Sequence, residues 1–146
     1  MTDGTVSDDL SSPRWIRTSS LIEERLNVLP AGGVLSIDLN GTEVLGAPYV
    51  QVLRILDGDA FSAEFSSNEF LGATFRMTRQ QAKVMNDLGW NAPDSLRLEG
   101  ENHNFHLAVE TRNARDLAKL IARTFREVYP RIDPEVLVHM IATVAP

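Results

Sequence analysis

The chain has 146 residues and a mass of 16.2 kDa, which is the size of one ordinary domain. Hydrophobic residues make up 43% of it, enough for one core without a metal ion or a disulfide. The absence of cysteine excludes a disulfide scaffold, a cysteine nucleophile and thiolate metal ligands. The net charge of −6 disfavours nucleic acid as a partner, and the acidic N-terminus and the lack of a long apolar run predict a cytoplasmic protein without membrane insertion.

The N-terminal part is expected to be an arm followed by a helix. Residues 1–11 are small, polar and acidic, so we expect a disordered arm ahead of a single domain over residues 12–146. Apolar side chains then recur at steps of three and four, which predicts a helix over residues 13–29. A capping-box pattern that begins at Ser20 leaves open a break of this helix near Thr18.

Three antiparallel strands are expected after the first helix. Apolar and polar residues alternate over 35–39, and Asn40-Gly41 is typical of a tight hairpin turn. Residues 49–56 form the next run. Side chains on both faces of this predicted strand are largely apolar, which indicates a central strand. A turn then leads to a third strand over residues 60–65.

The second half of the sequence predicts a helix, two strands and a longer helix. A capping box at Thr78 indicates a short helix over residues 79–88. Residues 95–98 and 105–110 have strand composition, and Asn113 begins the strongest amphipathic pattern of the chain. The expected fold is therefore α+β, an antiparallel sheet packed by helices in the order α-β-β-β-α-β-β-α.

The C-terminal tail is expected to add a short helix. Pro130 ends the long helix, and Asp133-Pro134 has the composition of a new helix start. Leu137, Met140 and Ile141 follow at steps of three and one, and we expect them either to cap the core or to pack on a partner.

The sequence contains no motif that indicates a catalytic or metal centre. His103 and His106 are three residues apart in a predicted strand, which directs their side chains to opposite faces rather than to one metal ion. The acidic pairs are typical of turns and solvated helix faces. We therefore predict no enzymatic activity, no metal and no cofactor, with an enzyme that uses one of the two histidines as a remaining alternative.

Several side chains are candidates for a peptide-binding groove. Trp15 and Trp90 are the only tryptophans and stand at helix ends, where either core packing or partial exposure is compatible with the sequence. We predict Trp15, Ile16, Leu21 and Trp90 as peptide contacts. A basic flank on the last helix is typical of a solvated face and would also suit an acidic partner segment; it comprises Arg112, Arg115, Arg123, Arg126 and Arg131.

The sequence also resembles a known family. Five motifs occur in order between Glu64 and Leu137, namely Glu64–Leu71, Leu88–Pro93, Asn104-Phe105, Leu117-Ala118 with Phe125–Val128, and Asp133–Leu137. In these motifs the sequence is similar to the actinobacterial YbjN-like proteins. Those proteins are grouped with the type III secretion chaperones as TY-Chap peptide-binding chaperone domains. Such chaperone-like folds have the same order of elements as the one predicted above.

The resemblance implies a non-enzymatic α+β domain, often dimeric, that binds a peptide or a partner protein. We therefore predict a chaperone-like module, expected as a homodimer, that captures an extended segment of a partner protein by strand addition or in a groove. A small acidic immunity or antitoxin-like protein that blocks a toxin is the alternative. Its association with the toxin would depend steeply on salt, whereas capture of an apolar segment would not.

Overall fold

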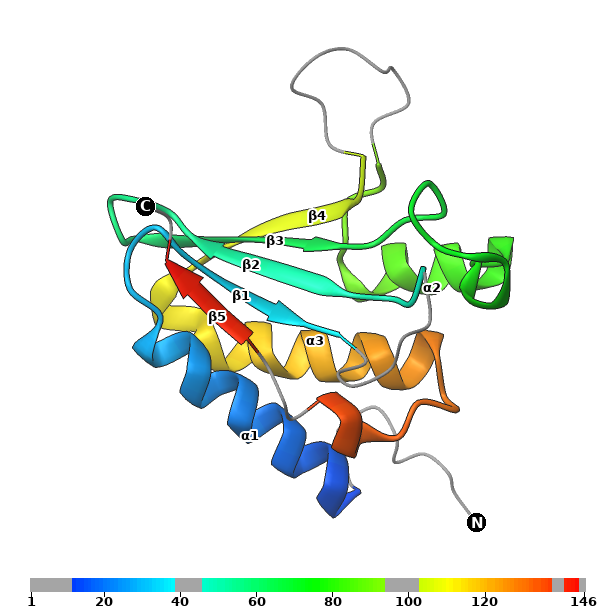
Figure 1. The fold of residues 1–146 in the computed structure, drawn as a ribbon, viewed down its shortest axis with the longest axis horizontal. Coiled ribbons are helices and arrows are strands. Elements are labelled where there is room, and N and C mark those ends of the chain that lie inside the picture. Colours follow the sequence, from blue (N-terminus) through cyan, green and yellow to red (C-terminus); the bar gives the residue numbers. More distant parts are fainter. Residues whose placement is uncertain (1–11, 39–45, 94–102, 138–140, 145–146) are drawn as a thin grey trace.

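The computed structural model describes residues 12–38, 46–93, 103–137 and 141–144, which form an α+β structure with one antiparallel sheet (Figure 1). The predicted arm over residues 1–11 lies outside the described residues. Each strand is antiparallel to its neighbours in the order β4-β3-β2-β1-β5. The strands are β1 (Gly33–Ile37), β2 (Val50–Arg54), β3 (Ala60–Phe65), β4 (Phe105–Glu110) and β5 (Ile141–Val144). The expected fold class is confirmed.

The helices pack mainly against one face of the sheet. Helices α1 (Pro13–Val28) and α3 (Ala114–Val128) lie side by side beneath it, and α2 (Arg79–Leu88) lies at one end (Figure 1). Helix α1 has no break near Thr18. That residue is fully buried, and its hydroxyl donates to the carbonyl of Arg14 one turn earlier, 3.1 Å away. The continuous form of the first helix is therefore the correct alternative.

Buried and more exposed side chains alternate along the strands, and the buried ones form one side of the core. β2 lies between β1 and β3, as its doubly apolar sequence predicted. The side chains of these three strands that face the helices are at most 1% exposed; they are Leu35, Ile37, Val50, Val52, Phe61, Ala63 and Phe65. Helix α3 meets them with Leu117, Ile121 and Phe125, spaced four apart on one helix face. Burial of each large apolar side chain contributes about 1.5–3 kcal/mol, so this layer dominates the stability of the fold.

Helix α2 has the ends that its sequence predicts. The Thr78 hydroxyl accepts from the backbone N–H of Gln81, and the Gln81 side chain accepts from the backbone N–H of Thr78. Gly89 ends the helix at φ 113°, a conformation that side-chain-bearing residues rarely adopt. Of its apolar residues, Met85 is fully buried. The capping box thus fixes the start of α2 close to the loop that follows β3.

Two further predictions fall on residues that the structure does not describe. These are the hairpin turn at residues 40–41 and the strand at residues 95–98. Of the elements that flank these residues, β1 pairs antiparallel with β2 as expected. Strand β4 pairs antiparallel with β3, a pairing that the sequence did not predict.

The C-terminal tail differs from its prediction. A single 3-10 turn, η4 (Pro134–Leu137), follows α3, and the chain then forms strand β5 instead of more helix. Strand β5 pairs with β1, and Val34 lies opposite Thr143. The sequence Ile-Ala-Thr-Val is rich in β-branched residues, which favour a strand once a sheet edge supplies backbone partners. The step from Leu137 to Ile141 was wrongly interpreted as a helical spacing.

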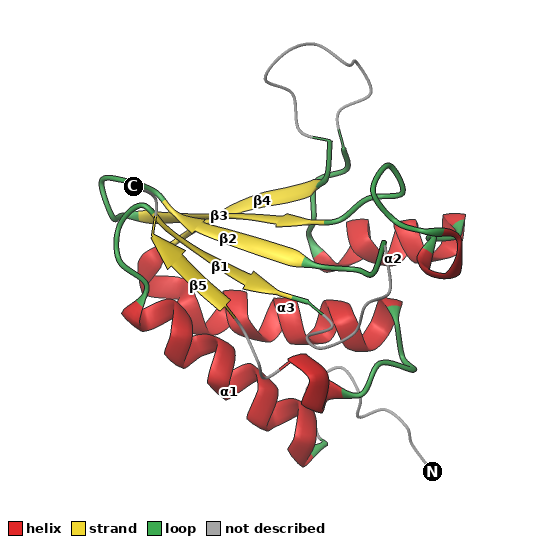
Figure 2. Cartoon of the chain, viewed as in Figure 1, coloured by secondary structure: helices red, strands yellow, loops and turns green. Residues whose placement is uncertain are grey.

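The second face of the sheet carries no described helix (Figure 2). A row of small and medium-sized residues crosses this face, formed by Val34, Leu53, Ser62 and Ala108 at paired positions of β1 to β4. Leu53 is 40% exposed there. Among the described helices, none is both long enough and apolar enough to cross a membrane.

Candidate functional site

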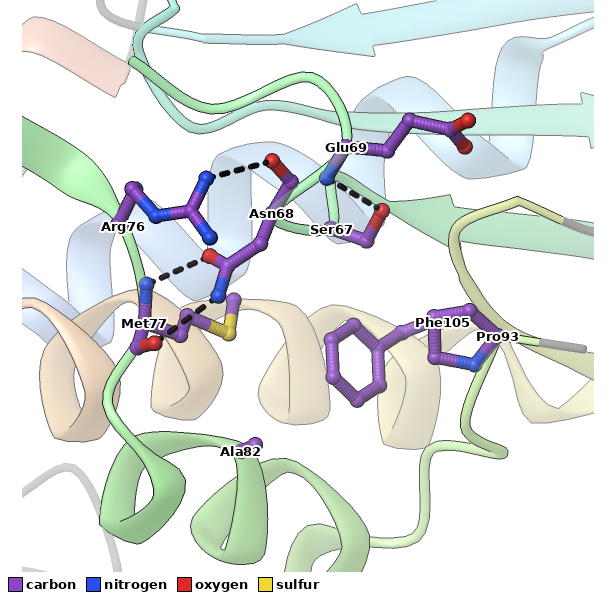
Figure 3. Close-up of a pocket in the computed structure, with 8 residues that line it drawn as sticks. All are labelled: Ser67, Asn68, Glu69, Arg76, Met77, Ala82, Pro93 and Phe105. Atoms are coloured by element: carbon purple, nitrogen blue, oxygen red, sulfur yellow. Dashed lines mark hydrogen bonds between the residues drawn. The ribbon is translucent and has the colours of Figure 1, made fainter. Parts of the chain in front are cut away.

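A pocket of about 500 Å³ opens between the β3–α2 loop, helix α2 and the start of β4 (Figure 3). Its floor is apolar, and the side chains of Met77 and Phe105 extend toward each other across it. Both residues are almost fully buried, at 7% and 5% exposure. The residues that line the pocket are Ser67, Asn68, Glu69, Arg76, Met77, Ala82, Pro93 and Phe105. This volume lies within the range of about 300–1,000 Å³ that is usual for ligand pockets.

Asn68 closes the loop above the pocket on itself. Its side-chain nitrogen donates to the carbonyl of Met77 at 3.0 Å, and its side-chain oxygen accepts from the N–H of Met77 at 2.7 Å. The side chain therefore pairs with both backbone groups of one residue, as a neighbouring antiparallel strand would. Arg76 adds a longer bond from its guanidinium to the carbonyl of Asn68, at 3.4 Å. These bonds hold the upper and left walls of the pocket together in Figure 3.

Polar bonds, one of them buried, attach the same loop to the two residues just before β4. The backbone N–H of Ser67 donates to the side-chain oxygen of Asn104 at 3.0 Å, and the Ser67 hydroxyl donates to the carbonyl of His103 at 2.7 Å. Asn104 is 7% exposed, and its amide nitrogen donates to the Tyr49 hydroxyl and to Glu64. A buried polar group must be hydrogen-bonded to be tolerated, and here the bonds fix the position of the loop.

The far end of the loop is fixed by close backbone contact and by α3. Gly46 has φ 76°, and a Cβ there would lie 2.2 Å from the backbone nitrogen of Gly72, so only glycine fits. The Tyr129 hydroxyl donates to the carbonyl of Phe75 at 2.7 Å, and the two rings pack edge to face. Burial raises the pKa of the Tyr129 phenol above its ordinary value, which keeps it protonated as a donor. The pocket is therefore preformed.

The charged groups at the rim differ in their partners. Glu69 is paired with His103 at 2.9 Å, and its side chain extends away from the pocket centre (Figure 3). Arg76 is exposed, and within the described part of the chain no carboxylate pairs with it. The two predicted histidines are separate, since His106 Nδ1 lies 3.1 Å from the carbonyl of Asn104 while His103 contacts Glu69.

The basic flank predicted on the last helix is largely paired within the chain. Arg115 contacts Glu23 on α1, and Arg123 contacts Glu127 one turn along α3. Arg112 contacts Glu110. These pairs leave the pocket rim, rather than α3, as the place where a cationic side chain stands beside a cavity.

Among the described residues, strand β4 has a short edge near the pocket that no strand pairs with. Asn91 and His106 exchange two backbone hydrogen bonds, of 2.9 and 3.0 Å, on the side of β4 away from β3. The N–H and C=O of one residue in an antiparallel strand point the same way, and alternate residues share that direction. The peptide groups of Ala108 therefore also point outward, and no described strand pairs with them there. An edge of this kind can accept a further strand.

The structure separates the four residues that the sequence predicted as peptide contacts. Trp90 is 2% exposed, and its indole N–H donates to the Thr124 hydroxyl at 2.9 Å, so it lies in the core. Trp15 is also buried, at 7% exposure, and Leu21 is partly buried against the core. Ile16 alone of the four is well exposed, at 47%. None of them lines the pocket.

Five of the eight pocket residues lie in the family motifs, although the sequence did not mark them as a site. Motif Glu64–Leu71 contains three of them, Leu88–Pro93 ends on Pro93, and Asn104-Phe105 supplies Phe105. Hydrophobic periodicity does not reveal such residues because most of them lie in loops. A short polar cluster directly after a strand, such as Ser-Ser-Asn, is the signal that indicates side chains able to bond to nearby backbone.

Comparison with known proteins agrees with the motifs. The chain matches the family TY-Chap3, described as "T3SS (YopN, CesT) and YbjN peptide-binding chaperone 3", over residues 8–142. No curated protein and no solved structure gives a significant match. The match runs from before α1 into the start of β5 and includes every residue of the pocket. The chain therefore belongs to the TY-Chap3 family of peptide-binding chaperones.

Proposed function

We propose that the protein is a non-enzymatic chaperone-like module that holds an extended segment of a partner protein, with one side chain of the segment anchored in the pocket between the β3–α2 loop and β4. The observation that carries this proposal is the preformed apolar floor of that pocket, made by Met77 and Phe105. A cavity that needs no rearrangement loses little entropy when it is filled.

The polar groups around the pocket favour binding over chemistry. Asn68 is bonded to Met77, and the Ser67 hydroxyl is bonded to His103. Side chains that already serve the fold are poorly placed to act as nucleophile or base, since such roles require access to a substrate. What the pocket presents to a ligand is an apolar surface with charged groups at its edge.

The free edge of β4 suits the extended form of the segment. Phe105 lines the pocket, and Ala108 lies three residues further along the same strand, about 10 Å away at the usual rise of a strand. A segment anchored in the pocket is therefore close to peptide groups that can pair with it.

The family resemblance supports a homodimer as the working form.

Photo-crosslinking tests the proposal directly. Phe70 is 47% exposed and adjoins the rim residue Glu69, so a photoreactive phenylalanine analogue there would lie near a bound segment without disturbing the core. Leu56, 82% exposed in the turn between β2 and β3, is the matched control position. We expect crosslinks at Phe70 to peptides of a partner protein, identified by mass spectrometry, and none of these peptides at Leu56.

A second variant distinguishes pocket binding from incidental proximity. Ala82→Phe places a large side chain into the cavity from α2, where Ala82 is only partly buried. We expect it to abolish crosslinking at Phe70 while the circular dichroism spectrum is unchanged. Equal crosslinking with and without this variant contradicts the proposal. A partner that is lost on addition of salt would instead favour the acidic immunity-like alternative.

A further inference from the structure

Among its described lining residues, the pocket combines an apolar floor with one positive group at the rim, and this combination restricts what it can bind. Met77 and Phe105 face each other across the floor (Figure 3). Methionine adapts its shape to a neighbour and packs well against aromatic rings. The floor therefore fits an apolar or aromatic side chain and offers no hydrogen-bonding side chain to a polar one.

Arg76 is the cation at this rim. Its guanidinium lies beside Asn68, to whose carbonyl it donates over 3.4 Å (Figure 3). That bond is long and uses one of five N–H donors, so the group retains most of its capacity. A carboxylate is the ligand that a guanidinium binds best, through two parallel hydrogen bonds.

Several other arginines in the described part of the chain are paired with carboxylates. Arg14 and Arg17 of α1 pair with Asp133 and Glu135 at the C-terminal turn. Such pairs hold elements of the fold together. Arg76 has no carboxylate partner among the described residues, and it stands next to a cavity rather than between two elements.

The other rim charge does not cancel that of Arg76. Glu69 is paired with His103, and its carboxylate is directed away from the pocket centre (Figure 3). The chain as a whole carries a charge of −6, so long-range attraction does not favour an acidic ligand. Preference for a carboxylate must therefore come from direct contact at Arg76.

We propose that the pocket recognises an apolar residue directly adjacent to an acidic residue inside an extended peptide segment, with the apolar side chain on the Met77–Phe105 floor and the carboxylate on Arg76. This inference rests on the proposed function and adds the chemistry by which the segment is selected. It commits to a side-chain carboxylate of Asp or Glu, because the captured segment lies within a longer partner.

Titration with short blocked peptides tests the selection rule. The probes are acetylated, amidated peptides of sequence Gly-Ser-Gly-Phe-X-Gly-Ser, in which X is Asp or Asn, and binding is followed by NMR through the methyl groups of Met77 and Ala82. We expect the Asp peptide to bind about fivefold more tightly than the Asn peptide, as an exposed ion pair allows. Arg76→Gln should remove this preference without weakening the Asn peptide.

One control variant and several contrary outcomes separate the possible failures. Arg131→Gln, which changes the net charge equally at an exposed position outside the pocket, should keep the preference. Equal binding of the two peptides to the native protein, or a preference that survives Arg76→Gln, overturns the selection rule but leaves the proposed function standing. If neither peptide shifts the Met77 and Ala82 methyl signals, both proposals fail. A peptide that ends in Phe with a free C-terminal carboxylate is the last probe. If it binds more tightly than the blocked Asp peptide, Arg76 recognises the C-terminus of a peptide, and the rule is also overturned.

Discussion

The helical layer beneath the sheet and the loop between β3 and α2 are held by different forces. In the layer, apolar side chains such as Ile22, Leu26 and Ile121 are fully buried between α1, α3 and the sheet. In the loop, position depends on hydrogen bonds between backbone groups and the side chains of Asn68, which donates, and Asn104, which accepts. Burial of apolar side chains stabilises strongly but does not depend on their exact orientation. A hydrogen bond contributes less free energy but requires a defined distance and angle between its two groups. The first force builds the fold and the second shapes the pocket.

The largest expected effect comes from breaking the apolar layer. Trp90→Ala removes a side chain that is 2% exposed, packs edge to face on Phe65 and bonds to Thr124. We expect a loss of about 3–5 kcal/mol in the free energy of unfolding, measured by urea denaturation and circular dichroism.

An exposed residue on the same layer is the control for that loss. Ile16→Ala, at a position that is 47% exposed, should change stability by no more than about 0.5 kcal/mol. If Trp90→Ala left stability intact and instead weakened capture of a partner, Trp90 would be a binding residue as the sequence suggested, and its assignment to the core would be wrong.

A smaller effect is expected from breaking the polar attachment of the loop. Asn104→Ala leaves the buried N–H of Ser67 without its acceptor, which we expect to cost about 1–3 kcal/mol. Unlike the tryptophan variant, it should also increase hydrogen exchange at the Ser67 and Met77 amides before the rest of the chain unfolds. Asn86→Ala, on the exposed face of α2, is the matched control and should change neither quantity. Faster exchange across the whole sheet would contradict a separate role for these bonds.

The same contrast explains what the sequence could predict. Helix α3 was located by its apolar spacing and α2 by its capping box, because both patterns depend only on neighbours in sequence. Strand β5 was missed because a four-residue tail acquires its structure from the edge of β1, more than 100 residues earlier. Tertiary context of this kind overrides local pattern.

The pocket was harder to predict than the fold for a related reason. Asn68 acts through a bond to Met77, nine residues away, and Ser67 acts through Asn104, 37 residues away. No periodicity relates such pairs. Trp15 and Trp90 were predicted as contacts because they are large aromatic residues. Large aromatic residues are as common in cores as in interfaces, and the structure places both in the core.

The smallest effect concerns the far end of the loop, where the Tyr129 side chain contributes both apolar packing and a hydrogen bond. The Tyr129 ring packs against Phe75, and its hydroxyl donates to the Phe75 carbonyl. Tyr129→Phe keeps the ring and removes the bond, so at neutral pH we expect a loss of about 0.5–1.5 kcal/mol.

The alkaline range isolates this bond from the packing. Burial raises the pKa of Tyr129 in the folded state, whereas in the unfolded chain it has its ordinary value of about 10. Below pH 10 the phenol is protonated in both states and the stabilisation is constant. Above pH 10 the unfolded state releases the proton first, so the native protein loses stability by up to about 1.4 kcal/mol per pH unit from this group. Denaturation curves of the native protein and of Tyr129→Phe should therefore converge as the pH rises from 9 to 11, and curves that stay parallel would show that the phenol is not held as a buried donor.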